Sequence, residues 1–276
     1  MLGLLLLLQV LASCLWLGHS EVVPFFADCR QFFYARILPS DALHPENPAW
    51  ICQWYRNSYH YATLYDRDRR IPVYSAYIYQ PGSGQRHHTW SFVEPQVNES
   101  YPKEMEREWV LRHQYKFPID KIKQSQAVLE DYKKMTGLDR GQLIPSGHQD
   151  STDSKTATFT LTNTVPQNSD LYTGRWNTYE SQIMPTYTMN CTTTYVITGA
   201  VPGKIYVADG RVNKPSHIWS AACCLVGTQP KKAWGLIAEN DKNQVENLSL
   251  GELEATLTEF YGGKTVTLFS KACPRQ

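Results

Sequence analysis

Apolar and polar positions alternate over short stretches of this chain, which predicts several β-strands. Residues 62–65 and 73–79 are rich in β-branched and aromatic side chains, and the polar stretch DRDRRIP between them suits a hairpin connection. A buried strand is expected at residues 158–161. Later short strands are expected at residues 195–197, 205–208, 218–225 and 234–238.

Apolar repeats with the helical period predict helices elsewhere in the chain. Residues 121–135 carry an imperfect apolar stripe, and a second helix is expected over residues 174–183. The clearest helix is residues 249–261, because Ser249 and Glu252 make a capping box at its start. Its apolar face consists of Leu250, Leu253, Leu257 and Phe260. These elements predict the α+β fold class with a mostly antiparallel sheet.

Composition indicates one globular domain with little bulk charge. The 276 residues are 42% hydrophobic, and neither an internal repeat nor a long linker divides them. Lys and Arg number 27 against 26 for Asp and Glu, a formal net charge of +1. Bulk charge therefore does not predict nucleic-acid binding, and any positive surface has to be local.

The chain begins with an apolar run that is typical of a secretory signal peptide. The run ends in small residues, Gly18 and Ser20, at the positions expected before a cleavage site at Glu21. It is too short to favour a membrane span. We expect a signal peptide at residues 1–20, a single mature domain at residues 21–276 and a secreted protein. A bacterial lipoprotein signal ending at Cys14 is the alternative.

Six cysteines and three sequons fit an exported chain. The cysteines after the signal peptide predict about three disulfides whose pairing the sequence does not determine. Adjacent Cys223 and Cys224 are expected to bond different partners. Asn98, Asn190 and Asn247 begin glycosylation sequons. The six cysteines are Cys29, Cys52, Cys191, Cys223, Cys224 and Cys273.

Two segments in the middle of the chain carry the chemistry. DRGQLIP, residues 139–145, precedes a stretch ending in TNTVPQNSDLYTGRWNTYE, residues 162–180. Together they resemble the DNA/RNA non-specific endonuclease family, the ββα-metal nucleases. CQWYRNSYHYATLYDRDRRIPVYSAYIY, PSHIWSAACC and the terminal helix are similar to vertebrate endonuclease domain-containing 1 proteins. The resemblance covers nearly all of residues 21–276. It implies a ββα-metal nuclease fold with a central sheet flanked by helices.

The resemblance also implies residue roles in metal-dependent cleavage of DNA or RNA. In the family a histidine after Asp-Arg-Gly is the general base, the arginine stabilises phosphate charge, and an asparagine binds Mg²⁺. A later glutamate orients the water around that ion. Arg140, Asn163 and Glu180 match the family pattern. Gln142 occupies the base position and Tyr172 the metal-ligand position.

These two substitutions predict impaired catalysis. Imidazole has a pKa near ~6.5 and accepts a proton at neutral pH, whereas the amide of Gln142 does not. Loss of a general base typically costs about 10² to 10⁴ in rate. A neutral phenol, with a pKa of about 10, is a poor replacement for an amide oxygen on Mg²⁺. We therefore expect weak Mg²⁺ binding at Tyr172 and little cleavage.

Other residues offer replacements. His148 reaches the base position only if the chain turns back, because six extended residues span up to about 20 Å. Asn177 is three residues before Glu180, so a helix places both on one face, although a solvated position is the simpler interpretation. Arg67, in a basic hairpin, either binds phosphate or is merely solvated. The pair at 87–88 is interpreted as surface histidines.

Three hypotheses follow. The first is a secreted glycoprotein whose nuclease activity is absent or very low and which binds DNA or RNA in a cleft retaining Arg140, Asn163 and Glu180. The second is an active Mg²⁺-dependent endonuclease with a relocated base. The third is an extracellular binding or structural protein with a protein or glycan partner. Fold alone does not choose among them.

Overall fold

The computed structural model describes residues 22–87, 92–93 and 104–276. The expected signal peptide, residues 1–20, lies outside the described residues, as do His88 and the sequon at Asn98. Across the described part of the chain, no helix is both long enough and apolar enough to cross a bilayer.

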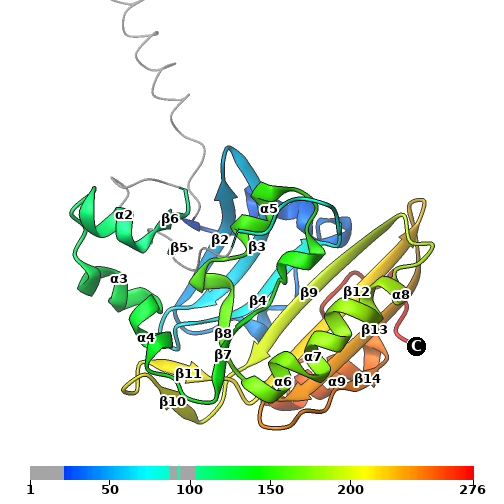
Figure 1. The fold of residues 1–276 in the computed structure, drawn as a ribbon. Helices are drawn as coiled ribbons and strands as arrows, with labels where there is room; N and C mark the ends of the chain where they lie inside the picture. Colours follow the sequence, from blue (N-terminus) through cyan, green and yellow to red (C-terminus); the bar gives the residue numbers. More distant parts are fainter. Residues whose placement is uncertain (1–21, 88–91, 94–103) are drawn as a thin grey trace, which may run out of the picture.

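An eight-stranded antiparallel sheet organises the molecule (Figure 1). The strand order is β1-β2-β3-β4-β9-β12-β13-β14, so the two halves of the sheet meet where β4 pairs with β9. The strands are β1 Val22–Val23, β2 Pro48–Tyr55, β3 Ser58–Asp66, β4 Ile71–Ile78, β9 Thr193–Val201, β12 His217–Val226, β13 Gln229–Glu239 and β14 Glu246–Leu248. The predicted α+β class and antiparallel central sheet are confirmed.

Most of the predicted strands are present in longer form. The hairpin of β3 and β4 encloses the DRDRRIP stretch, and β12 pairs with β9 and β13 over nearly its whole length. Within the described ranges, three two-stranded sheets accompany the central one. They are β5 Phe92–Val93 with β6 Glu106–Arg107, β7 Leu138–Gln142 with β8 Thr164–Asn168, and β10 Ile205–Val207 with β11 Val212–Lys214.

The strand predicted at residues 158–161 is wrong. The chain there forms a turn after a short helix and then a 3₁₀ turn at Leu161–Asn163, and the strand begins only at Thr164. Threonine hydroxyls compete for the backbone groups that a strand would use, since Thr164 Oγ1 donates to the Thr160 carbonyl at 2.8 Å. The β-branched composition of this segment therefore did not indicate its conformation.

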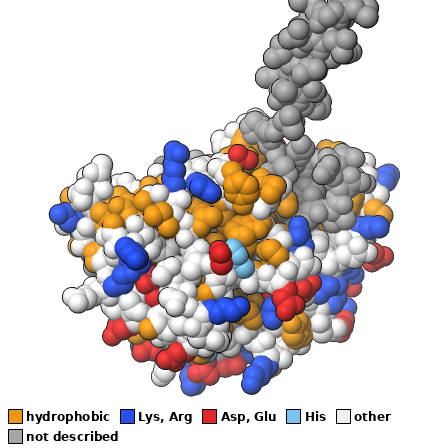
Figure 2. Space-filling view, turned by 180° about the vertical axis from the view of Figure 1, so that it is seen from behind, with side chains coloured by type: hydrophobic (Ala, Val, Ile, Leu, Met, Phe, Trp, Pro, Cys, Tyr) orange, Lys and Arg blue, Asp and Glu red, His pale blue; other side chains and the backbone are white. Residues whose placement is uncertain are grey.

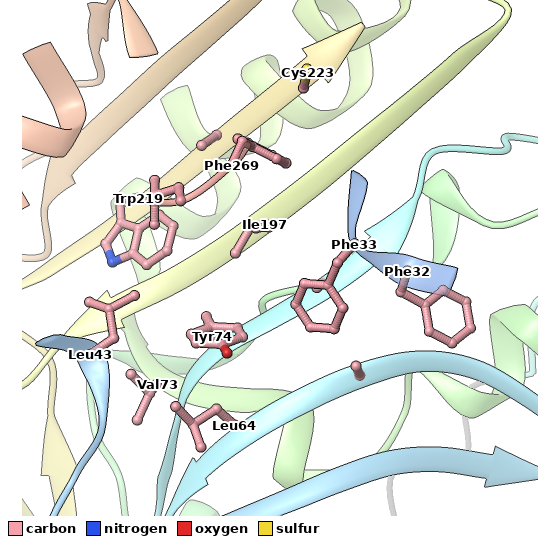
Figure 3. Packing of buried hydrophobic residues seen from close by; sticks show 14 of the residues in the cluster. Phe32, Phe33, Leu43, Leu64, Val73, Tyr74, Ile197, Trp219, Cys223 and Phe269 are labelled. Atoms are coloured by element: carbon pink, nitrogen blue, oxygen red, sulfur yellow. The ribbon is translucent and has the colours of Figure 1, made fainter. Parts of the chain in front are cut away.

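Alternate side chains of the sheet enter two separate cores. Trp219, Ala221 and Cys223 of β12 face a core that also contains the N-terminal segment and α9 (Figure 3). Ala222 and Cys224 face the opposite side. That side carries helices α2 to α8 and the β7–β8 pair, which lie in front of the sheet in Figure 1.

The helices are short except at the C-terminus. The helix predicted over residues 121–135 is wrong as one element, because extended residues Gln126 and Val128 separate α3 from α4. The Asp131 carboxylate accepts from the Val128 amide at 2.9 Å and starts α4 anew. The helices are α2 Glu108–His113, α3 Ile119–Ser125, α4 Leu129–Lys133, α5 Thr152–Ala157, α6 Ser169–Thr173, α7 Arg175–Thr178, α8 Met184–Tyr187 and α9 Leu250–Phe260, with a π turn at Tyr179–Ile183.

The terminal helix α9 has the predicted start. Ser249 Oγ accepts from the Glu252 amide, and the Glu252 carboxylate accepts from the Ser249 amide at 2.7 Å. Leu250, Leu253 and Leu257 are buried as expected. Phe260 is not, since 44% of it is exposed, and its ring lies 4.5 Å from the His217 ring.

Three disulfides tie the ends of elements to the sheet. They join Cys29 to Cys52, Cys191 to Cys224, and Cys223 to Cys273. The adjacent cysteines of β12 bond different partners, as predicted, because successive strand residues point to opposite faces. The Cys191–Cys224 bond attaches the end of the α8 segment to the sheet.

On the face seen in Figure 2, the described residues form no field of one charge sign. Hydrophobic side chains gather near its centre, and acidic and basic side chains are interspersed around them. This agrees with the near-zero net charge of the sequence. Any contact with a polyanion must therefore depend on a few local cations.

Candidate functional site

A pocket of about 550 Å³ lies in front of the sheet, between the end of β7 and the helical stretch from α6 to α8. Gln142, Tyr172 and Glu180, three of the predicted site residues, line it together with His148 and Arg86. The tertiary structure therefore brings Gln142 and Tyr172, to which the resemblance assigns the base and metal-ligand positions, to one cavity.

Gln142 is the last residue of β7 and is 7% exposed. Its Nε2 donates to the Thr158 carbonyl at 2.7 Å and lies 3.1 Å from Thr158 Oγ1. The amide is thus held in place by the turn that replaces the predicted strand. A side-chain amide does not take a proton from water near neutral pH, so Gln142 can orient a ligand but cannot act as a base.

The packing of β7 against β8 explains why position 141 of the Asp-Arg-Gly motif is a glycine. β7 pairs with β8 so that Gly141 lies opposite Val165, and the Gln167 side chain crosses over Gly141. A Cβ at position 141 would lie 2.2 Å from Gln167 Oε1 and 2.7 Å from Gln167 Cβ. Only glycine permits this close approach of the two strands.

Tyr172 enters the pocket from α6, which Asn168 caps through its Oδ1. The ring is half-buried, and burial raises the pKa of the Tyr172 phenol above its ordinary value. The phenol is therefore neutral near pH 7. It presents one hydroxyl to the pocket where the family resemblance expects an amide oxygen.

Glu180 comes from the π turn that follows α7. Burial raises the pKa of the Glu180 carboxyl to about 8, while the Trp176 side chain and the charge of Arg86 act in the opposite direction. Near neutral pH the protonated form is therefore favoured. A π turn in a helix is often found at a functional site, and here it carries Glu180, which lines the pocket together with Asn177 of α7.

The side chains present do not fit a Mg²⁺ ion well. Mg²⁺ prefers anionic and other hard oxygen ligands in a tight octahedron. The pocket offers a neutral phenol at Tyr172 and a carboxyl at Glu180 whose pKa favours the protonated form. Over residues 22–87, 92–93 and 104–276, no group of three His, Cys, Asp or Glu side chains could hold a metal ion.

Arg140 stands next to the pocket rather than in its lining. It shares one face of β7 with Gln142, because residues two apart on a strand point the same way. Its positive charge acts to lower the pKa values of Tyr172 and Tyr132. Arg140 therefore lies close enough to contribute to the electrostatic potential at the pocket.

Asn163 lies behind the pocket and is fully buried. Its Oδ1 accepts from the Ile144 amide at 3.2 Å, and its Nδ2 donates to the carbonyls of Ile144 and Thr158 at 3.1 and 3.0 Å. Direct contact with a substrate would require Asn163 to leave these bonds. In this structure its amide fixes the two backbone segments that hold Gln142.

Arg67 is at the opposite end of the β3–β4 hairpin from the pocket. β4 runs from Ile71, beside the hairpin turn, to Ile78, and the next residue, Tyr79, lines the pocket. At the rise of a β-strand, the distance along the chain from Ile71 to Tyr79 is about 25 Å. Arg67 Nη1 donates to the Pro48 carbonyl at 2.7 Å. The structure does not bring Arg67 to Gln142, Tyr172 and Glu180.

His148 reaches the pocket because the chain turns back at the 3₁₀ turn Ser146–His148. The ring is buried, with Nε2 2.9 Å from the Glu180 carbonyl and Nδ1 2.7 Å from the Tyr77 hydroxyl. A carbonyl only accepts, so Nε2 carries the proton and Nδ1 accepts from Tyr77. Burial lowers the His148 pKa to about 4. The chain therefore makes the turn that His148 needs to come near Gln142.

Arg86 also lines the pocket, although no motif in the sequence predicts a role for it. It follows a segment that runs along residues 148–150, with the Gly84 amide donating to the Asp150 carbonyl at 2.8 Å. A Cβ at Gly84 would lie 2.3 Å from the Ser151 carbonyl carbon, so glycine is required there. The guanidinium lies 5.5 Å from the Phe159 ring centroid. The glycines in GSGQR, residues 82–86, are the feature of the sequence that could have indicated a tightly packed loop beside Arg86.

A solved structure shares this architecture. The chain matches one in the crystal structure of the EndoG/EndoGI complex with a TM-score of 0.50 and 17% identity, covering 75% of this chain and 83% of that one. The chain therefore has the ββα-metal nuclease fold.

Sequence comparisons identify the family. The family model for DNA/RNA non-specific endonucleases matches residues 38–261, and the chain belongs to that family. It is 32% identical over 240 residues to the endonuclease domain-containing 1 protein of Homo sapiens, covering 84% of this chain and 46% of that protein. It is 31% identical over 262 residues to the protein of the same name in Mus musculus, covering 92% and 50%. The chain thus spans about half the length of these two relatives.

Proposed function

We propose that this chain is a secreted, disulfide-bonded glycoprotein that binds nucleic acid on a nuclease scaffold and cleaves it very slowly or not at all. The observation that carries the proposal is that Gln142 and Tyr172 line one pocket with Glu180. The family resemblance gives these three positions to the general base, the metal ligand and the residue that orients the metal's water.

Secretion rests on the apolar run at residues 1–20 and on three disulfides, which persist in oxidising compartments. Nucleic acid as ligand rests on family membership and on Arg86 and Arg140 at and beside the pocket. A guanidinium presents a planar set of donors that matches a phosphate oxygen pair.

In this proposal the pocket binds a phosphodiester without moving a proton. Arg86 and Arg140 supply positive charge, and the Tyr172 hydroxyl supplies a neutral polar contact. No step is assigned to Mg²⁺, because the residues present do not fit the ion. Loss of both the base and the metal ligand acts on the same chemical step, so the two losses need not multiply.

A plasmid-nicking assay with Mg²⁺ or Mn²⁺ tests the proposal. The natural chain is compared with the Gln142→His/Tyr172→Asn double variant. We expect no nicking above background by the natural chain and at least about 10²-fold faster nicking by the double variant. Nicking by the natural chain at the rate of the double variant would contradict the proposal. Short DNA and RNA oligonucleotides without metal test binding separately, over a range of salt concentrations.

An active nuclease with a relocated base is the second candidate, favoured by the place of His148 in the pocket. Two facts weigh against it. The acceptor nitrogen of His148 is bonded to Tyr77, and the Glu180 carboxylate forms mainly above pH 8. If this candidate is correct, His148→Gln or Glu180→Gln abolishes nicking by the natural chain.

A further inference from the structure

One edge of the central sheet is β14, a strand of three residues, and β1 is the other. It pairs with β13 only at Gly235, Leu236 and Ile237, although β13 is eleven residues long. Exposed edge strands can pair with strands of other molecules, and proteins usually block or cover such edges. Among the described residues no further strand pairs with β14.

Asn247 is the middle residue of this edge strand and begins the sequon Asn247-Leu248-Ser249. Asn247 is exposed and lies directly opposite Leu236, whose side chain enters the core beneath the α7–α8 helices. Opposite residues of an antiparallel pair share a face. The Asn247 side chain therefore leaves the edge on the side of those helices.

A groove of about 750 Å³ runs around this edge. Arg175, Thr178 and Ile183 line it from the α7 and π-turn side, Phe260 of α9 lines it from the other, and Asn247 lies within the lining. The groove is polar at Arg175 and partly apolar at Ile183 and Phe260. This mixture suits the polar and apolar surfaces of sugar rings.

We propose that Asn247 is an N-glycosylation site and that its glycan occupies this groove, covering the β14 edge of the sheet. The inference rests on the proposed secretion. In the modification, Asn247 Nδ2 bonds to the anomeric carbon of an oligosaccharide. The bond from that carbon to a lipid pyrophosphate carrier breaks, and an amide proton passes to a base of the transferring enzyme.

The glycan would leave the candidate site open. Asn177, Glu180 and Ser181 of the α7–π helical stretch line the pocket, whereas Arg175, Thr178 and Ile183 of the same stretch line the groove. The two cavities therefore lie on different sides of one helical segment. Glycosylation at Asn247 is compatible with nucleic-acid binding in the pocket.

The full chain, expressed in mammalian secretory cells, tests the site. Enzymatic deglycosylation in ¹⁸O water followed by peptide mass spectrometry should label Asn247 in the natural chain and in Ser249→Thr, which keeps the sequon. The mass of secreted Asn247→Gln should be lower than that of the natural chain by the mass of one glycan. Secreted protein with unmodified Asn247 overturns the inference and leaves secretion intact. Intracellular protein that keeps residues 1–20 and carries no glycan overturns both.

Self-association tests the covering of the edge. Asn190 is also exposed and begins a sequon, and it lies in the turn after α8, not in an edge strand, so Asn190→Gln is the matched control. Light scattering across protein concentrations should show a shift to larger mass for Asn247→Gln and none for Asn190→Gln. Equal mass for Asn247→Gln and the natural chain at every concentration overturns the covering role.

Discussion

The Tyr77 hydroxyl donates a 2.7 Å hydrogen bond to Nδ1 of His148, so the imidazole that reaches the candidate pocket has its acceptor nitrogen occupied. Both residues are buried, and the other ring nitrogen donates to the Glu180 carbonyl. The bond joins β4 of the central sheet to the turn that forms one wall of the pocket. This hydrogen bond fixes the turn at the pocket wall, and it also occupies the nitrogen with which His148 could accept a proton.

Removal of the Tyr77 hydroxyl should weaken the fold. Tyr77→Phe leaves Nδ1 of His148 buried without a donor, which should lower the free energy of unfolding by about 1–3 kcal/mol in urea titrations. It should also raise the His148 pKa, because the lost bond stabilises neutral imidazole. Tyr79→Phe is the control, since the Tyr79 ring contacts His148 edge-on at 4.8 Å and this contact does not need the hydroxyl. Equal effects of the two variants would contradict the assigned bond.

Glu180 should make stability depend on pH. Its folded pKa, about 8, is above the ordinary 4.5, so its contribution is fully present below pH 4.5 and is lost as the pH rises toward 8. Between pH 5 and pH 8 the free energy of unfolding of the natural chain should therefore fall by about 2–4 kcal/mol relative to that of Glu180→Gln. Thermal melts at both pH values measure this.

A control separates this effect from a general change in charge. Glu246→Gln, at an exposed position, should differ from the natural chain equally at both pH values. His148 acts in the opposite sense, because its folded pKa of about 4 is below 6.5 and its contribution is lost as the pH falls through that range. A Glu180→Gln gain that is the same at pH 5 and pH 8 would rule out the raised pKa.

Gly141 should tolerate no side chain. Gly141→Ala places a methyl group 2.7 Å from Gln167 Cβ, and such overpacking should cost about 1–3 kcal/mol of stability. Gly147→Ala, near the same pocket, has no heavy atom within 4 Å of the added carbon and should cost little. Chemical denaturation of both variants is the measurement, and similar midpoints would show that β7 and β8 do not approach so closely.

Asn163 should support the site without touching a ligand. Asn163→Ala leaves the Ile144 amide and the Ile144 and Thr158 carbonyls without this partner, at a cost on the order of 3 kcal/mol. Asn177→Ala, exposed in the pocket, should change stability by less than about 0.5 kcal/mol. A stable Asn163→Ala variant with weaker oligonucleotide binding would instead favour direct contact between Asn163 and the nucleic acid.

Arg86 should carry more of the binding than Arg67. Arg86→Ala should weaken oligonucleotide binding and lower the slope of log affinity against log salt by about 1, because one phosphate contact is lost. Arg67→Ala, in the distant hairpin, should leave the slope unchanged. Fluorescence anisotropy at several salt concentrations distinguishes them. The reverse order would move the nucleic-acid surface to the β3–β4 hairpin.

The sequence by itself determined the elements whose signals are local. The β3–β4 hairpin follows from two β-branched, aromatic runs, and the start of α9 follows from Ser249 and Glu252, because capping uses residues three apart. It also determined that an amide and a phenol stand at positions 142 and 172, since identity needs no folding. Local signals failed at residues 158–161, where threonine hydroxyls and Asn163 bond backbone groups that a strand would have used.

Only the tertiary structure decided what surrounds those two residues. Arg86, Gln142, His148 and Glu180 come from four segments that meet because the chain turns at Ser146–His148 and a glycine segment packs along residues 148–150. Burial then sets the pKa values of His148 and Glu180 in opposite directions from their ordinary values. The proximity of these side chains and the desolvation of their titratable groups arise from packing between distant parts of the chain, so they cannot be predicted from the spacing of residues in the sequence.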